Sequence, residues 1–157
     1  MQLANLRECP EAIPTLATWH HAQWSELNPH KTMEMRIAAL QKHLGPEAIP
    51  VTFVAVEDGQ PLGSASLVER DLATHTHLGP WLASVYVTHE RRRQGIGGQL
   101  VRRVVEEAAR LHFDRLYLFT LDQEPFYREL GWERLERNHF RGHPIVVMSI
   151  APQQAAS

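Results

Sequence analysis

A basic segment that runs into glycines has the residue types that bind a pyrophosphate group. It reads Arg92-Arg93-Gln94-Gly95-Ile96-Gly97-Gly98 and follows the apolar run Val85-Tyr86-Val87. Glycines let the backbone come close to a ligand, and the free N–H groups and the dipole of a helix start attract an anion. Arginine side chains add charge that pairs with phosphate oxygens. We therefore predict an anion site over residues 92–98.

Several patterns compete for this segment, including an ordinary helix start with a charged cap. A dinucleotide fingerprint, G-x-G-x-x-G/A, fails because Leu100 stands at its last position, and a P-loop fails because the chain has no Gly-Lys pair. The pattern R-x-x-G-x-G/A fits at Arg92, Gly95 and Gly97. In these residues the sequence resembles the GNAT superfamily of N-acetyltransferases, in which this pattern binds acetyl-coenzyme A.

A second motif, Phe126-Tyr127-Arg128-Glu129-Leu130-Gly131-Trp132, agrees with that resemblance. It is similar to the F-Y-x-x-x-G-[FW] segment of the superfamily, in which a short helix presents a tyrosine and ends at a glycine. Pro125 suits the first turn of such a helix, where its missing N–H is not needed, and Gly131 suits a left-handed stop.

The resemblance implies a role for each of these segments. Backbone groups of Val85, Tyr86 and Val87 would pair with the pantetheine arm, and residues 92–98 would hold the pyrophosphate. Tyr127 would be the general acid that protonates the departing thiolate, because a phenol donates a proton while remaining neutral at pH 7. The alternative for Tyr127 is a buried structural tyrosine. The expected coenzyme-binding residues are Val85, Tyr86, Val87, Arg92, Arg93, Gln94, Gly95, Ile96, Gly97, Gly98 and Tyr127.

The general base is less evident from the sequence. Many members of the superfamily carry a glutamate on the central strand, but Trp81 to Val87 contains no carboxylate, and Ser84 is its only hydroxyl besides Tyr86. The nearest acids by topology are Asp71, which we take as the candidate base, and Glu69, Asp122 and Glu124. Each of these is alternatively a solvated loop carboxylate, and a water chain or an amine that binds already neutral removes the need for a base.

Periodicity predicts the elements that position these residues. Strands are expected over 3–7, 52–57, 62–68, 80–87, 115–119, 132–140 and 145–150, and helices over 13–24, 32–44, 97–111 and 125–130. This order matches the GNAT fold, an α/β (α+β) fold with a mixed, mostly antiparallel, six- to seven-stranded splayed sheet flanked by about four helices. The resemblance implies that the sheet opens between the strand at Val85 and the strand at Leu116, and that the coenzyme lies in the opening.

Length and composition restrict the class of protein. The chain has 157 residues, of which 43% are hydrophobic and 22% charged, and we expect one domain over 1–150 and a loose tail over 151–157. A net charge of −2 argues against a nucleic-acid partner. The single cysteine, Cys9, excludes an intrachain disulfide. No apolar run reaches ~18 residues, and the pattern of the first residues does not lead us to expect a signal peptide. We therefore expect a cytoplasmic protein with no membrane partner.

Ten histidines raise the question of a metal site. His75 and His77 share a face if they lie on a strand, and His20 and His21 are adjacent, but the ligand sets typical of zinc are absent. We therefore predict no metal, and expect these histidines, with Glu69 and Asp71, to line the entrance for an acceptor. His89 stands where the superfamily commonly has proline, and a surface position is expected for it.

The leading hypothesis is an acetyl-CoA-dependent N-acetyltransferase that acts on a primary amine of a small molecule by direct transfer in a ternary complex. The alternatives are an acetyl-CoA binding or sensing module without turnover, and a protein N-terminal or lysine acetyltransferase. Trp24 and Trp81 are candidates to stack on an apolar acceptor ring. The C-terminal strand pair and the exposed sheet edge are possible contacts of a homodimer.

Overall fold

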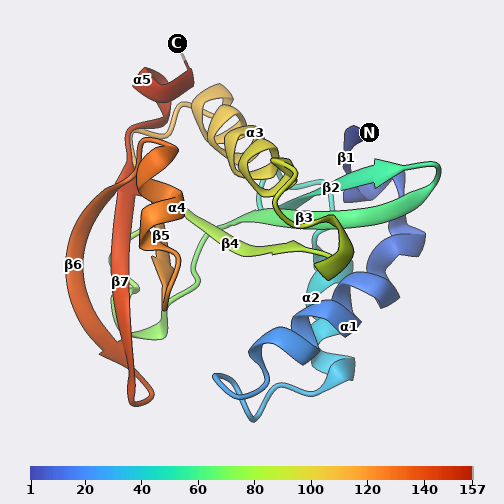
Figure 1. Cartoon of the computed structure of the whole chain (residues 1–157), viewed down its shortest axis with the longest axis horizontal. Coiled ribbons are helices and arrows are strands. Elements are labelled where there is room, and N and C mark those ends of the chain that lie inside the picture. The colour runs from blue at the N-terminus through green and yellow to red at the C-terminus, as the bar shows by residue number, and fades with distance from the viewer. Residues whose placement is uncertain (157) are drawn as a thin grey trace.

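A computed structural model of the chain describes residues 1–156, which form a seven-stranded mixed sheet with helices on both faces (Figure 1). The strands are β1 (Gln2–Asn5), β2 (Val51–Glu57), β3 (Gln60–Val68), β4 (Trp81–Val87), β5 (Leu116–Thr120), β6 (Glu133–Phe140) and β7 (His143–Ile150). The α-helices are α1 (Ile13–Trp24), α2 (Met33–Lys42), α3 (Ile96–Arg110), α4 (Glu124–Glu129) and α5 (Pro152–Ala156). None of the helices within residues 1–156 is long and apolar enough to span a membrane.

The sheet has the order β1-β2-β3-β4-β5-β7-β6, and β4 and β5 are its one parallel pair of neighbours within residues 1–156. The pair is short: Trp81 aligns with Tyr117, whose N–H donates to the Pro80 carbonyl at 3.0 Å, and the strands then diverge. All other neighbouring strands are antiparallel. The prediction of a splayed, mostly antiparallel sheet of six to seven strands is confirmed.

A β-bulge bends β4 near the point where it leaves β5. Opposite β3, Tyr86 aligns with Ser64 and Ala83 aligns with Ser66, so that two residues of β4 face one residue of β3. Ser84, inside this interval, has a left-handed backbone with φ of 54°. Bulges bend a strand and redirect its side chains, and this one gives the second half of β4 a new direction.

Helix α3 covers one face of the sheet and buries an apolar stripe against it. The buried side chains on this stripe include Leu100, Val101, Val104, Val105 and Ala108. Glu107 is also buried, although the sequence pattern of this helix indicates an exposed, charged residue at this position. It accepts hydrogen bonds from Arg103 at 3.2 Å and from Arg110, which explains how a carboxylate is retained there.

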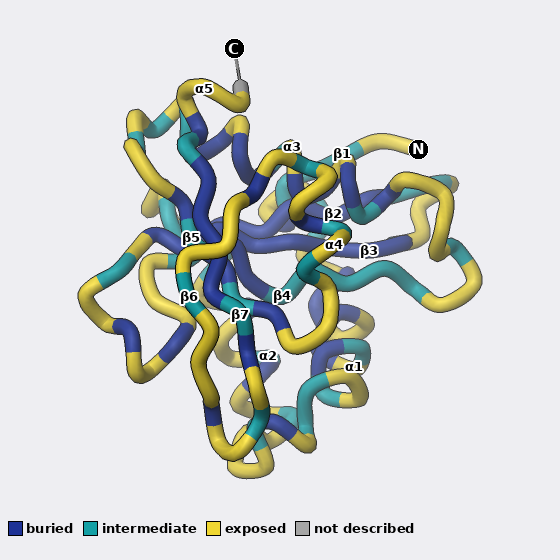
Figure 2. Tube along the Cα trace, turned by 60° about the vertical axis from the view of Figure 1, so that its left-hand side comes forward, coloured by how far each residue is buried: buried dark blue, intermediate teal, exposed yellow. Residues whose placement is uncertain are grey.

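The opposite face of the sheet is covered by α1 and α2. Because side chains alternate along a strand, Val54 points away from its neighbours Phe53 and Ala55. Val54 packs with Leu16 and Leu40 of the two helices, whereas Phe53 and Ala55 belong to the cluster around α3. Figure 2 shows the central strands buried between these layers, while most of β6 is exposed at the sheet edge.

Short-range signals account for most of the element boundaries. The Thr32 hydroxyl caps α2 by accepting from the Met35 N–H at 3.1 Å, and Asp58 and Gly59 form the hairpin turn with φ of 52° and 76°. Several boundaries differ from expectation by one or two residues. The first strand ends at Asn5, because the Asn5 side chain caps a 3₁₀ turn, and α2 ends at Lys42, two residues before Leu44.

The C-terminal residues are more ordered than the sequence suggests. A loose tail is expected over 151–157, but Pro152–Ala156 form helix α5, and the Gln153 amide donates to the Ala109 carbonyl of α3 at 2.7 Å. Ser157 lies outside the described residues. The expectation failed for residues 152–156 because this helix depends on contact with α3, which no local pattern encodes.

Gly63 allows β3, β4 and α3 to pack closely, which leads to a testable prediction. A Cβ atom at this position would lie 2.6 Å from the Tyr86 carbonyl oxygen and 3.2 Å from Leu100 Cδ1. We expect Gly63→Ala to lower the free energy of unfolding by about 1–3 kcal/mol through overpacking, measured by urea denaturation.

Gly98→Ala is the matched control, because a Cβ there would meet its nearest neighbours at an ordinary 3.6 Å. Alanine favours a helix over glycine, so this variant should be neutral or more stable. Equal destabilisation by the two substitutions would contradict the close-packing explanation.

Candidate active site

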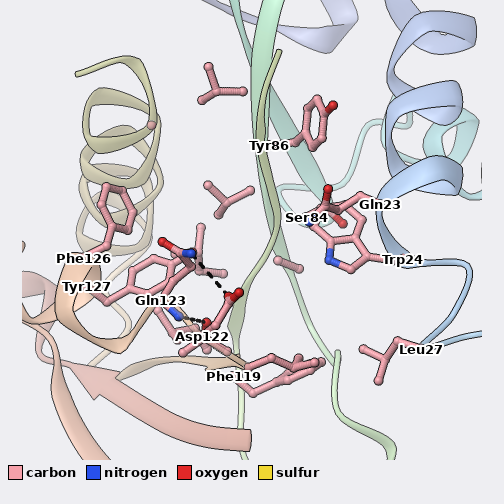
Figure 3. Close-up of a pocket in the computed structure, with 18 of the residues that line it drawn as sticks. Gln23, Trp24, Leu27, Ser84, Tyr86, Phe119, Asp122, Gln123, Phe126 and Tyr127 are labelled. Atoms are coloured by element: carbon pink, nitrogen blue, oxygen red, sulfur yellow. Dashed lines mark hydrogen bonds between the residues drawn. The ribbon is translucent and has the colours of Figure 1, made fainter. Parts of the chain in front are cut away.

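A cleft of about 740 Å³ lies where β4 and β5 diverge. Its walls come from β4, β5, α4 and the start of α3 on the sheet side, and from α1, the α1–α2 loop and α2 on the other side. Figure 3 shows Phe126 and Tyr127 on one side of β4, and Gln23 and Trp24 on the other. Segments that are far apart in the sequence therefore meet in one cavity.

The start of α3 forms an anion-binding corner of the cleft. Gly95 precedes the helix in a left-handed conformation with φ of 83°, a backbone that favours glycine, and Gly95 through Gly98 line the cleft. The first i→i−4 hydrogen bond of this turn runs from the Gln99 N–H to the Gly95 carbonyl at 3.1 Å. The preceding N–H groups, including those of Ile96 and Gly97, therefore have no acceptor within the helix and suit an anion.

The arginines before this turn line the cleft but differ in their contacts. Arg91 pairs with Glu57 at 2.6 Å and donates to the Gln94 side chain at 2.9 Å. Arg92 donates to the Val87 carbonyl at 2.9 Å. Within residues 1–156, the Arg93 side chain has neither a hydrogen bond nor an ion pair, and Arg93 is exposed.

Two of these contacts refine the residue set that the sequence indicates. Gln94, expected among the coenzyme contacts, does not line the cleft, because its side chain is held by Arg91. Arg91, which the expected set omits, does line it. The free guanidinium of Arg93 is the one best placed to pair with an added phosphate.

The edge of β4 presents backbone groups to the same cavity. Val85, Tyr86 and Val87 line the cleft, and on this edge β4 has no partner strand beyond Trp81. The Tyr86 ring is fixed by stacking on Trp19, with ring centroids 5.2 Å apart. Free N–H and C=O groups on a strand edge can bind an extended, amide-containing ligand as an added strand would.

Tyr127 lies on α4 at the wall of the cleft and is only 8% exposed. The helix has Pro125 in its first turn and ends before Gly131, whose φ of 97° provides the expected left-handed stop. The Tyr127 ring packs edge-on against Phe126 and Trp132 at centroid distances of 5.0 and 6.1 Å. Burial raises the pKa of the phenol above its usual value, so that it stays protonated across the physiological range.

The four candidate carboxylates are separated by the fold. Asp71 and Asp122 line the cleft, whereas Glu69 does not and Glu124 is held by Arg134 at 2.7 Å. Asp71 is an exposed residue at the wall of the cleft, where the neighbouring protein removes part of the water around its carboxylate. This desolvation raises the pKa of Asp71 to about 6, against a smaller opposing effect of the Lys31 charge. Asp122 accepts a hydrogen bond from the Gln123 amide at 3.3 Å.

The acceptor side of the cleft contains residues that the sequence pattern does not indicate. Glu26, Lys31 and Arg36 line it, and so does Asn28 of the α1–α2 loop. Trp24 lines the cleft. Trp81 is fully buried and donates to the Leu78 carbonyl at 2.8 Å, which corrects the idea that it stacks on an acceptor.

A comparison with models of protein families identifies the family of this chain. The model of the acetyltransferase (GNAT) family matches residues 13–132, which is most of the sequence and includes both motifs. The chain belongs to the GNAT family of acetyltransferases. A sequence comparison with curated proteins finds no match for this GNAT chain.

Solved structures share the fold at low sequence identity. One is an aminoglycoside 6'-N-acetyltransferase complexed with coenzyme A, at 17% identity, 97% coverage of each chain and a TM-score of 0.77. A second is a ribosomal-protein-alanine N-acetyltransferase from Brucella melitensis, at 20% identity, with 96% of this chain and 99% of that chain covered and a TM-score of 0.76. A third is a spermidine N-acetyltransferase chimera from Vibrio cholerae and hSSAT, at 16% identity, 99% coverage of each chain and a TM-score of 0.72.

The histidines of this GNAT chain are dispersed. His75 is buried and forms hydrogen bonds with Glu136 and the Thr74 hydroxyl. We expected it at the acceptor entrance, but it does not line the cleft. His143 lines the cleft and His89 is exposed. Within residues 1–156, no three or more His, Cys, Asp or Glu side chains are grouped to hold a metal ion.

His20 is buried beneath the acceptor wall and leads to a prediction about stability. It contacts Ser64 Oγ at 3.3 Å, and desolvation, aided by the Arg36 charge, lowers its pKa from 6.5 to about 4. The unfolded chain therefore binds a proton between pH 6.5 and 4 that the folded chain does not. We expect the free energy of unfolding to fall as pH decreases through this window, measured by urea denaturation at successive pH values.

The His20→Gln variant should lose less stability over this window, because one buried imidazole no longer titrates. His43, whose pKa is also lowered to about 4 by burial, should leave part of the slope in place. The control is His139→Gln, which removes an exposed histidine and should keep the wild-type slope. An unchanged slope in the His20 variant would contradict the assignment of the neutral imidazole.

Proposed function

We propose that this protein transfers an acetyl group from acetyl-coenzyme A to the primary amine of a small molecule, directly within a ternary complex. The observation that carries the proposal is the convergence of three features on one cleft. They are the anion-binding start of α3, the unpaired edge of β4 and the buried phenol of Tyr127. Membership in an acetyltransferase family agrees with this combination.

The residues in the cleft fit the chemical groups of coenzyme A. The free guanidinium of Arg93 and the N–H groups that follow Gly95 suit its pyrophosphate. The open edge of β4 at Val85 and Tyr86 suits the amides of the pantetheine arm. The coenzyme supplies the activated acetyl group as a thioester, and the protein supplies position, charge and protons.

Transfer needs a neutral amine, a stabilised oxyanion and a leaving thiolate. Asp71 accepts the proton of the incoming ammonium, directly or through water, and leaves a lone pair free to attack the carbonyl carbon. As the C–N bond forms and the C–S bond breaks, a backbone N–H of the β4 edge stabilises the negative charge on the acetyl oxygen. Tyr127 donates its phenolic proton to the thiolate, and the second proton of the attacking nitrogen, released as the amide forms, returns to the Tyr127 oxygen through water.

The fold alone does not select the acceptor. The three solved structures compared above carry the names of aminoglycoside, ribosomal-protein and spermidine acetyltransferases. A small molecule is favoured here because the α1–α2 loop contributes Glu26 and Lys31 to the wall of the cleft, which encloses the acceptor side. The decisive experiment is a coenzyme-release assay against polyamines, aminoglycosides, amino acids and short peptides.

The role of Tyr127 is tested by Tyr127→Phe, which removes the hydroxyl and keeps the ring packing. We expect kcat to fall by about 100-fold because a positioned proton donor is lost, with acetyl-coenzyme A affinity unchanged by calorimetry. An unchanged kcat would contradict the role of general acid. Coenzyme binding without turnover on any amine, in the wild type as well, would favour a binding or sensing module.

The role of Asp71 is tested through pH dependence, because its raised pKa of about 6 suits a base near neutrality. Because the base acts in its ionised form, kcat/KM should fall as pH decreases through about 6. Asp71→Asn should lower kcat/KM at pH 7 and abolish this acidic limb. Glu69→Gln, which removes a carboxylate outside the cleft, should retain it. Retention of the limb in Asp71→Asn would assign the titration to another group.

A further inference from the structure

Arg36 is a buried cation without a counter-ion in the wall of the cleft. Its residue is only 8% exposed, and it lines the cleft from α2. Nε donates to His21 Nδ1 at 3.2 Å, but buried Nη2 has no hydrogen-bond partner. Within residues 1–156, no carboxylate lies within 4.0 Å of its guanidinium, although seven other ion pairs form.

Its neighbours do not neutralise this charge. His21 accepts the Arg36 hydrogen bond at Nδ1, so this nitrogen carries no proton and offers Arg36 no negative charge. His20 is neutral near pH 7, because burial and the Arg36 charge lower its pKa to about 4. The Lys31 charge, like that of Arg36, lowers the pKa of His20. Lys31 therefore adds to the positive potential around Arg36 and does not balance it.

A buried, unpaired guanidinium is costly unless an anion completes it. Arginine in particular binds carboxylates through a planar set of donors. The carboxylates that line the acceptor side, Glu26, Asp71 and Asp122, form no ion pair with Arg36, and they suit an ammonium group instead. The arginines at residues 91–93 belong to the loop that suits the pyrophosphate and do not account for a second cationic position on α2.

We propose that Arg36, assisted by Lys31, binds the carboxylate of an acceptor that carries both an amine and a carboxylate, an amino acid or a close derivative. The inference rests on the proposed function, because it names the acceptor class of the same cleft. The amine of such an acceptor faces Asp71, while its carboxylate completes the charge of Arg36. Polycations such as polyamines and aminoglycosides lack the anion and are disfavoured at this position.

The test uses matched pairs of acceptors that differ in one charge. The common amino acids are compared with their C-terminal amides in the coenzyme-release assay with acetyl-coenzyme A. We expect the acid to be the better substrate in at least one pair. Arg36→Gln should raise KM for that acid by about 10- to 100-fold, the effect of one charge-assisted hydrogen bond, with kcat and the KM of the amide little changed.

Two further variants separate recognition from folding. Arg36→Lys should restore part of the discrimination between acid and amide, because it retains the charge but loses the planar donor set. Arg115→Gln removes an exposed arginine outside the cleft and should leave both substrates unaffected. Equal KM changes for acid and amide in Arg36→Gln would indicate a structural role alone and would overturn the proposal.

The outcomes distinguish this inference from the proposed function. Turnover of amines with no preference for the acids, or with a preference for polyamines or aminoglycosides, would overturn the carboxylate site and support the acetyltransferase. Without turnover, calorimetry of the same acids with the coenzyme A complex decides: binding that Arg36→Gln abolishes supports the carboxylate site, although catalysis fails. The absence of both turnover and binding would overturn both.

Discussion

The short parallel contact between β4 and β5 is the constraint on which the rest of the site depends. Strands in one sheet ordinarily satisfy each other's backbone groups along their length. Here the register ends after Trp81 and Tyr117, and the bulge at Ser84 turns the remainder of β4. The strand edge that is left unpaired needs new hydrogen-bond partners, and in an acetyltransferase a ligand with amides can supply them.

The distribution of charge around this opening follows from which residues find partners in the fold. Arg91 is held by Glu57 at the end of β2, and Arg92 by the Val87 carbonyl, so that these residues brace the loop before α3. Among residues 1–156, three further cations that line the cleft have no carboxylate partner: Arg93, Lys31 and Arg36. Arg93 precedes α3, whereas Lys31 and Arg36 lie before and within α2, which gives the cleft two separate places for negative charge.

Removal from water sets the protonation states of three other side chains in or beside the cleft. Desolvation keeps the Tyr127 phenol protonated, raises the pKa of Asp71 to about 6 and keeps His20 neutral. The physical cause is shared, but the directions differ. The charged form of histidine is the protonated acid, so its pKa falls, whereas the charged form of tyrosine and aspartate is the deprotonated base, so their pKa values rise. A proton donor and a proton acceptor therefore occur in one cavity at neutral pH.

The sequence by itself determined the elements and the two contiguous motifs. Periodicity, the Thr32 cap, the Asp58-Gly59 turn and the Gly131 stop act within a few residues, so that they can be read without the fold. The anion-binding turn at 92–98 is local for the same reason, since its donors are consecutive N–H groups.

Only the tertiary structure decided which side chains meet in the cleft. Asp71 and Glu69 are two residues apart and equivalent by pattern, yet only Asp71 lines it. Arg36 reads as an ordinary helical arginine, Glu107 as a surface acid and residues 152–156 as a tail. Each outcome depends on contacts between residues far apart in the chain, and the burial and charge pairing that such contacts create have no local sequence signal.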